Sequence, residues 1–221
     1  MAPNRKENKQ YFYTVEGETE KWYLDWLEDE INANPAVNIK VTIKSKVEKN
    51  PLKYAKSIPI ITKVEITHLF DYESHEPIHV KQFIETLDLL KEANSIKGKQ
   101  IKYILGYSNL TFELWIALHK NDFNAHTEHR SHYLRHINSA FDERFTELST
   151  YKEEDTFKRM LRKLTLDDVK AAVRRAKGIM QRNAENGLQE LQYRGFKYFK
   201  DNPSLTIHES VERILRDCGL I

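Results

Sequence analysis

From Tyr11 to His119, short apolar runs alternate with stretches in which apolar residues recur every three or four positions. Short runs of this kind predict strands, and the periodic stretches predict helices. Strands are expected at 11–15, 37–43, 64–70 and 101–105, and helices at 22–31, 51–61, 80–90 and 112–119. Alternation of strand and helix favours an α/β unit built on a mostly parallel sheet flanked by helices.

The pattern changes near Asp122, where the strand signals disappear and helical spacing continues. Helices are expected at 132–145, 166–181 and 207–215, and Asn202-Pro203-Ser204 is typical of a helix start. The aromatic and basic residues of 193–199 favour a half-buried amphipathic helix, and stacking on single-stranded nucleic acid also suits them. We therefore expect an α/β domain over 1–121 and an α-helical C-terminal half over 122–221, packed against it.

Composition narrows the class of protein. The chain has 221 residues, 40% of them hydrophobic and 31% charged, which is typical of a globular protein. No apolar run approaches the roughly 20 residues that cross a bilayer, and polar residues 1–10 lack the apolar core of a signal peptide. Cys218 alone excludes an intramolecular disulfide and a cysteine-rich zinc site. A cytoplasmic protein without a membrane partner is expected.

The net charge of +2 says little about partners, because phosphate binding depends on local charge. Basic residues gather between Lys158 and Arg182, however, against only Asp167 and Asp168 in that stretch. This basic stretch is the best electrostatic candidate for a nucleic-acid face, with Arg174 and Arg175 as candidate substrate contacts. A solvated helix surface explains it equally well.

Acidic residues follow three of the expected strands. Glu16 follows the first strand, Asp71 and Glu73 follow the third, and Glu113 lies just past the fourth. Because ligands collect at the carboxyl ends of parallel strands, these acids are expected to meet at one edge of the sheet. Carboxylates gathered there repel one another unless a hard cation neutralises them, and Mg²⁺ prefers carboxylate oxygens. Glu20, one helical turn beyond Glu16, is a candidate assisting ligand.

Three segments of the chain are recognisable together. They are Val15-Glu16-Gly17-Glu18-Thr19-Glu20-Lys21-Trp22-Tyr23-Leu24, Leu69-Phe70-Asp71-Tyr72-Glu73, and Tyr107-Ser108-Asn109-Leu110-Thr111-Phe112-Glu113-Leu114-Trp115 with His119. In this order and spacing they resemble the leading motifs of the RloB family, over roughly residues 11 to 120. Weaker similarities follow at Lys152 and at residues 202–206.

The resemblance implies a Toprim-like fold in which Glu16, Asp71 and Glu73 bind Mg²⁺, with Mn²⁺ as a substitute. The residues that it places in the same pocket are Ser108, Asn109, Glu113 and His119. Members of the family are associated with bacterial abortive-infection and restriction loci, sometimes beside an ATPase. Two departures stand out: Glu73 replaces the more usual Asp, and Leu110-Thr111 replaces the more usual Pro-Cys.

Our first hypothesis is a magnesium-dependent nuclease of antiviral defence that hydrolyses phosphodiester bonds of RNA or DNA. In it Glu20 and Glu113 assist catalysis, and His119 or Lys152 handles protons or phosphate charge. A homodimer is the commonest assembly and is expected here. Two alternatives stay open: a catalytically silent effector or regulatory subunit of a defence ATPase, and a nucleic-acid-binding module.

Overall fold

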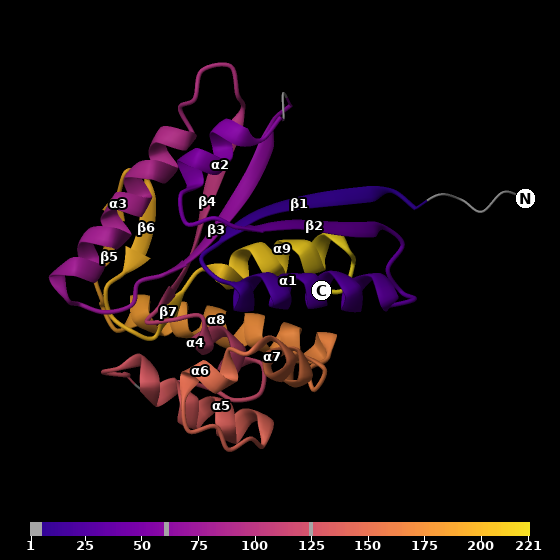
Figure 1. Ribbon diagram of the computed structural model, residues 1–221, viewed down its shortest axis with the longest axis vertical. Helices are drawn as coiled ribbons and strands as arrows, with labels where there is room; N and C mark the ends of the chain where they lie inside the picture. Colours follow the sequence, from indigo (N-terminus) through magenta and orange to yellow (C-terminus); the bar gives the residue numbers. More distant parts are fainter. Residues whose placement is uncertain (1–5, 60–61, 124–125) are drawn as a thin grey trace, which may run out of the picture.

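A central sheet of five strands organises the computed structural model, which describes residues 6–59, 62–123 and 126–221 (Figure 1). Its order is β2-β1-β3-β4-β7, and the first four strands are parallel while β7 runs antiparallel to β4. The strands are β1 (Asn8–Val15), β2 (Lys40–Val47), β3 (Val64–Asp71), β4 (Ile101–Asn109) and β7 (Ser204–Leu205). The predicted α/β class with a mostly parallel sheet is confirmed.

Helices cover both faces of this sheet, because its strands together place apolar residues on both faces. The crossovers between the parallel strands are α1 (Glu18–Ala33), α2 (Pro51–Ser57) and α3 (Pro77–Ala93). Tyr11, Tyr13 and Val15 of β1 join the core that contains α1, whereas Phe12 packs against the core of α2 and α3. The helix expected at 51–61 ends at Ser57, and residues 60–61 of that expectation lie outside the described residues.

The later part of the chain adds helices around the α1 side of the sheet (Figure 1). They are α4 (Glu113–Leu118), α5 (Tyr133–Phe141), α6 (Leu148–Tyr151), α7 (Glu154–Leu161), α8 (Leu166–Glu185) and α9 (Ile207–Asp217). Thr165 opens α8 with a capping box to Asp168, which fixes the start of the helix. The helices predicted at 166–181 and 207–215 are confirmed. The one predicted at 132–145 stops at Phe141, because Asp142 adopts a left-handed φ of 52°.

The prediction that strands end near Asp122 is wrong. The structure has β5 (Glu190–Tyr193) and β6 (Phe196–Phe199), a hairpin, in addition to β7. Arg194 and Gly195 both have positive φ, 54° and 93°, as a two-residue hairpin turn requires. The predicted helix over 193–199 is therefore wrong. Ser204 likewise lies in β7 rather than at a helix start.

The second strand begins and ends later than predicted. It runs from Lys40 to Val47, not from 37 to 43. Val37 supplied an apolar position that belongs to the loop before the strand, and it is buried there. The apolar pattern stops too early because the last part of the strand is polar, with Lys44, Ser45 and Lys46. An edge strand with a solvent-facing side accepts such residues.

The segment formed by β7 and α9 completes the sheet on the side of β4. Thr206, between the two elements, donates from Oγ1 to the carbonyl of Leu105 at 2.9 Å. Its Oγ1 also accepts from the backbone N–H of Tyr107 at 3.2 Å. At the far end of α9, the hydroxyl of Tyr11 donates to Asp217 at 2.7 Å. The end of the chain is thus packed against strands formed at its beginning.

Candidate active site

The carboxyl ends of β1 and β3 meet where the strand order of the sheet reverses. The chain leaves β1 for β2 on one side and returns to β3 on the other. Glu16 follows β1, and its Oε2 accepts a hydrogen bond of 3.0 Å from the backbone N–H of Asp71, the last residue of β3. Such a reversal is where α/β sheets bind ligands, so this bond marks the place to look for a site.

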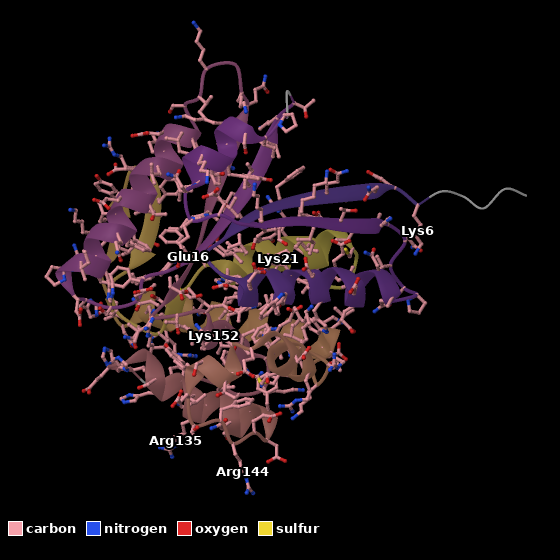
Figure 2. All side chains as sticks on the ribbon, in the orientation of Figure 1. Lys6, Glu16, Lys21, Arg135, Arg144 and Lys152 are labelled. Atoms are coloured by element: carbon pink, nitrogen blue, oxygen red, sulfur yellow. The ribbon has the colours of Figure 1, made fainter. Side chains whose placement is uncertain are left out.

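Two further carboxylates and a lysine join this place. Glu20 in the first turn of α1 is 6% exposed, and Glu113 at the start of α4 is 1% exposed. Lys152, between α6 and α7, places its Nζ 3.0 Å from Oε1 of Glu113. Figure 2 shows Glu16 near the end of β1 and Lys152 on the helical layer below it in this view. Side chains from both parts of the chain therefore converge here.

A pocket of about 230 Å³ lies between these groups. Its lining consists of Glu16, Gly17, Glu18, Thr19, Glu20, Lys49, Asp71, Glu73, Thr111, Arg130 and Lys152. We call this pocket, together with the adjoining carboxylate of Glu113, the acidic pocket. The sequence prediction that acids following separate strands meet at one edge of the sheet is confirmed for Glu16 and Asp71 by their direct hydrogen bond.

Burial and mutual repulsion raise the pKa values of the carboxylates in the acidic pocket. Burial, followed by the charges of Glu20, Glu16 and Glu113, raises the pKa of Asp71 well above its ordinary value. Burial and then the charge of Glu113 raise the pKa of Glu20 to about 7. Burial also raises the pKa of Glu16, to which the charge of Glu73 adds. Lys152 opposes the rise in all three, so a positive charge is what this pocket favours.

The donor set of the acidic pocket suits a hard divalent cation in its chemistry. Mg²⁺ binds carboxylate oxygens and retains several waters, so it needs few protein ligands. Oε2 of Glu113 is buried and has no hydrogen-bond partner within the described residues. A buried carboxylate oxygen without a partner is available to bind a cation or a water. Among the described residues, the side chains as they stand form no group of three metal ligands. The carboxylates would therefore have to close around an ion.

Glu73 is held differently from the other acids. Its backbone adopts a φ of 62°, and its carboxylate lies 3.0 Å from Nε2 of His79. Nδ1 of His79 is in turn hydrogen-bonded to the hydroxyl of Ser74 at 2.7 Å. Of the three predicted metal ligands, Glu16 and Asp71 are thus joined directly, whereas Glu73 stands at the edge of the pocket with a histidine partner.

Four predicted pocket residues are absent from the pocket's lining in the described chain: Ser108, Asn109, His119 and also Glu113, whose carboxylate adjoins the pocket through Lys152. His119 donates from Nδ1 to the carbonyl of Trp115 at 2.9 Å and accepts at Nε2 from the hydroxyl of Tyr23 at 3.1 Å. Burial lowers the pKa of His119 to about 4. Asn109 donates to the carbonyl of Lys200 at 2.7 Å, and Ser108 lies opposite Asp71 in the β3–β4 register. Ser108, Asn109 and His119 therefore contact the surrounding protein rather than the pocket.

The basic stretch from Lys158 to Arg182 is largely neutralised within the fold. Arg175 donates to the carbonyls of Leu118 and His119 at 2.8 and 3.0 Å and pairs with Asp122, so it fastens α8 to the end of α4. Five neighbours form ion pairs of their own: Lys158–Glu154, Arg159–Glu143, Lys163–Glu143, Lys170–Asp167 and Lys177–Glu212. Arg174 lies exposed on α8, away from the pocket lining.

Several residues of the site were missed in the sequence. Lys49, Thr111 and Arg130 line the acidic pocket. Tyr151 is fully buried, and its hydroxyl has no hydrogen-bond partner in the described part of the chain. Burial and then the charges of Glu113, Glu20 and Asp71 raise the pKa of that hydroxyl. Lys49 follows β2 and would have been found by the strand-end argument, had the end of that strand been predicted correctly.

Comparison with known proteins gives one match. The family model described as RloB-like protein matches residues 11–214, nearly the whole chain. No curated protein and no solved structure gives a significant match. Within the described residues, none of the helices is both long enough and apolar enough to span a membrane.

Proposed function

Because this chain belongs to the RloB-like protein family, we propose that it is a divalent-metal-dependent nuclease that hydrolyses RNA or DNA in bacterial anti-phage defence. The observation that carries the proposal is the acidic pocket, where the half-buried Glu16 and Asp71 from separate strand ends meet at the reversal of the sheet, beside the buried Glu20 and Glu113. Raised pKa values of Asp71, Glu20 and Glu16 support it, because such crowding costs folding energy and is typical of functional sites.

Glu16 and Asp71 are the residues we propose to hold Mg²⁺ or Mn²⁺, with Glu73 at the edge and Glu20 and Glu113 behind. When bound, the ion polarises a phosphoryl oxygen and lowers the pKa of its bound water. The protein contributes the placement of the phosphate. Lys152 carries a positive charge beside the same carboxylates, and we propose that it binds a phosphate oxygen and stabilises charge that develops there.

Lys49 and Arg130 line the outer part of the pocket, where their cationic groups suit the phosphates on either side of the cleaved bond. Both residues are exposed. They are therefore proposed to bind the substrate backbone rather than to take part in bond cleavage. The choice between RNA and DNA would then depend on contacts beyond these charges, because phosphate contacts carry no base information.

A catalytically silent subunit of a defence ATPase is the second candidate. The contact between Glu73 and His79 supports it, because it engages one proposed ligand in a pair within the protein. The pair between Lys152 and Glu113 supports it in the same way. Under this proposal the acidic pocket persists without a metal, and the chain acts through a partner.

The test is a cleavage assay on mixed RNA and DNA with Mg²⁺, Mn²⁺ or chelator, run beside calorimetric titration of the same ions. Glu16→Gln is the main variant, since it removes the carboxylate that bridges to β3. Glu18→Gln is the matched control, because Glu18 lies in the same segment and lines the pocket but is exposed.

The nuclease proposal expects metal-dependent cleavage and metal binding that are lost in Glu16→Gln and retained in Glu18→Gln. Folded protein that neither binds metal nor cleaves would refute it and favour the silent subunit. In that case the assay is repeated with a partner ATPase present. Cleavage that persists in chelator would also refute the metal-dependent mechanism.

A further inference from the structure

One face of the sheet is left open where β1 and β2 project from the molecule. Side chains of β1 and β2 that pair in register share a face, so Phe12 with Lys44 and Gln10 with Thr42 lie opposite the α1 side. Figure 1 shows α1 and α9 below this projecting part, whereas the described helices leave its upper side uncovered. Gln10, Lys40 and Lys44 are exposed, and Phe12 is half-buried.

Three lysines follow one another along this open face. Lys40, Lys44 and Lys46 of β2 are exposed and alternate with the buried positions Val41 and Ile43. We call them the β2 lysine row. Lys44 and Lys46 are two residues apart, about 6.5 Å along an extended strand. Within the part of the chain that the structure describes, no acidic side chain forms an ion pair with these three.

Aromatic rings lie directly under two lysines of the row. Nζ of Lys44 is 5.2 Å from the ring centroid of Phe12, and Nζ of Lys46 is 5.8 Å from that of Tyr54. Such contacts hold the ammonium groups over the sheet without an ion-pair partner, although the charge of Glu48 partly offsets that of Lys46. Flat rings interleaved with cations are the combination that binds single-stranded nucleic acid, through stacking and phosphate contacts.

Acidic residues near the row are engaged elsewhere. Glu48 pairs with Lys53, and Glu65 pairs with Lys102 and Arg213. Glu7 is exposed beside the first lysine, where its backbone carbonyl accepts from the N–H of Lys40. The net charge of the open face is therefore positive, in contrast to the basic stretch of the later helices.

The row leads toward the acidic pocket. Parallel strands place their carboxyl ends at one edge, and Lys49, just beyond the end of β2, lines that pocket. We infer that the open face of β1 and β2 is a binding track that guides a single strand of nucleic acid toward the acidic pocket. Its use as a substrate path rests on the proposed function, whereas the binding itself does not.

The test measures binding by fluorescence anisotropy of a labelled mixed-sequence single strand, as RNA and as DNA, in chelator so that no cleavage occurs. The variant is Lys44→Gln with Lys46→Gln. The matched control is Lys170→Gln with Lys177→Gln, which removes the same charge from the basic stretch, where both lysines are ion-paired. Thermal unfolding confirms that each variant is folded.

The expected result is a loss of affinity of roughly tenfold for the Lys44 and Lys46 variant. The slope of log affinity against log salt should fall by about 1.4, roughly 0.7 for each lost phosphate contact with a single strand. The control should keep both quantities within about twofold. In addition, Phe12→Leu should weaken the single strand more than a duplex, because stacking needs unpaired bases.

Equal losses in the two double variants, or no loss in the first, would overturn the inference. Binding of the row to vesicles of anionic lipid in place of nucleic acid would overturn it too. The failure of one proposal can be distinguished from the failure of the other. If the track binds nucleic acid but the protein is not a nuclease, the variant loses affinity and no cleavage is seen with any metal ion. A nuclease that does not use the track cleaves normally in the Lys44 and Lys46 variant.

Discussion

The acidic pocket and the basic stretch are both concentrations of charge, but they are built in opposite ways. In the pocket, burial and then the charges of neighbouring carboxylates raise the pKa values of Asp71, Glu20 and Glu16, with Lys152 as a nearby counter-charge. In the basic stretch, six of the nine cationic side chains form ion pairs with acids. A hydrogen bond from Arg159 there lowers the pKa of Glu143.

This difference teaches where to look for function in a charged protein. Paired surface charges contribute little to stability and little to the outside field. Uncompensated buried charges cost stability and are kept for a reason. In the sequence the acids stood out by their positions after strands, and the basic stretch stood out by its charge alone; the partners of each side chain in the fold distinguish the two regions.

The largest expected effect is on activity, in Asp71→Asn. Because loss of even an outer partner of a metal costs roughly 10–100-fold, loss of a direct ligand is expected to lower kcat/KM about 10³-fold. The free energy of unfolding in chelator at pH 8 should nevertheless rise, because the carboxylate whose pKa the fold raises is gone. Cleavage assays and urea unfolding check the two parts. A variant that lost activity together with stability would contradict this view of the pocket.

The next largest effect is expected in Glu20→Gln, on how the free energy of unfolding depends on pH. The pKa of Glu20 is about 7 in the fold against an ordinary 4.5, so its charge destabilises the fold above pH 7. The penalty shrinks as the pH falls from 7 and disappears only below 4.5, where both states hold the proton. In chelator the variant should therefore be more stable than the parent at pH 8, by up to about 3 kcal/mol, with the gap reduced to about 1 kcal/mol at pH 5.

Urea unfolding at a series of pH values measures this gap. Taking the difference from the parent removes the contribution of other titrating residues, including the buried His119. A gap that stays constant from pH 8 to pH 5 would show that Glu20 is not crowded by its neighbours. It would remove one ground for contrasting the two regions.

Removing one lysine from each region gives a smaller and more direct comparison. Lys152→Gln leaves the buried Glu113 without its ion-pair partner, which should cost about 1–3 kcal/mol of unfolding free energy. Lys170→Gln breaks a pair with the 89% exposed Asp167 and should cost less than about 0.5 kcal/mol. Chemical denaturation of both variants in parallel is the measurement. Equal costs would mean that the two regions hold charge in the same way.

The smallest effect concerns the two arginines predicted to contact substrate. Arg175→Gln removes donors to the carbonyls of Leu118 and His119 and should lower the unfolding free energy by about 1–2 kcal/mol. Arg174→Gln, at an exposed position, should change it by less than about 0.5 kcal/mol. Thermal unfolding of the pair checks this. A larger loss of unfolding free energy in Arg174→Gln than in Arg175→Gln would contradict the assignment of Arg175 as the residue that holds α8 against α4.

The parallel sheet and the meeting of Glu16 with Asp71 were predictable, because strand periodicity and the strand-end argument are local and strong. The hairpin of β5 and β6 was not, since its residues also fit an amphipathic helix and its turn uses Arg194 in a left-handed conformation. The location of His119 could not be predicted either. Its spacing from Glu113 is clear in the sequence, but its hydrogen bonds to Tyr23 and Trp115 depend on tertiary packing.

The packing of β7 and α9 against β4 also has a consequence for the order of events during synthesis. Ile207, Val211 and Ile214 of α9 are fully buried in the core that contains α1 and β1. While residues 204–217 are still inside the ribosome, the growing chain has an open edge at β4 and an uncovered apolar face. We therefore expect the sheet to be completed only after that segment has been translated. A growing polypeptide of this protein thus carries all the acids of the pocket well before it can hold them in place.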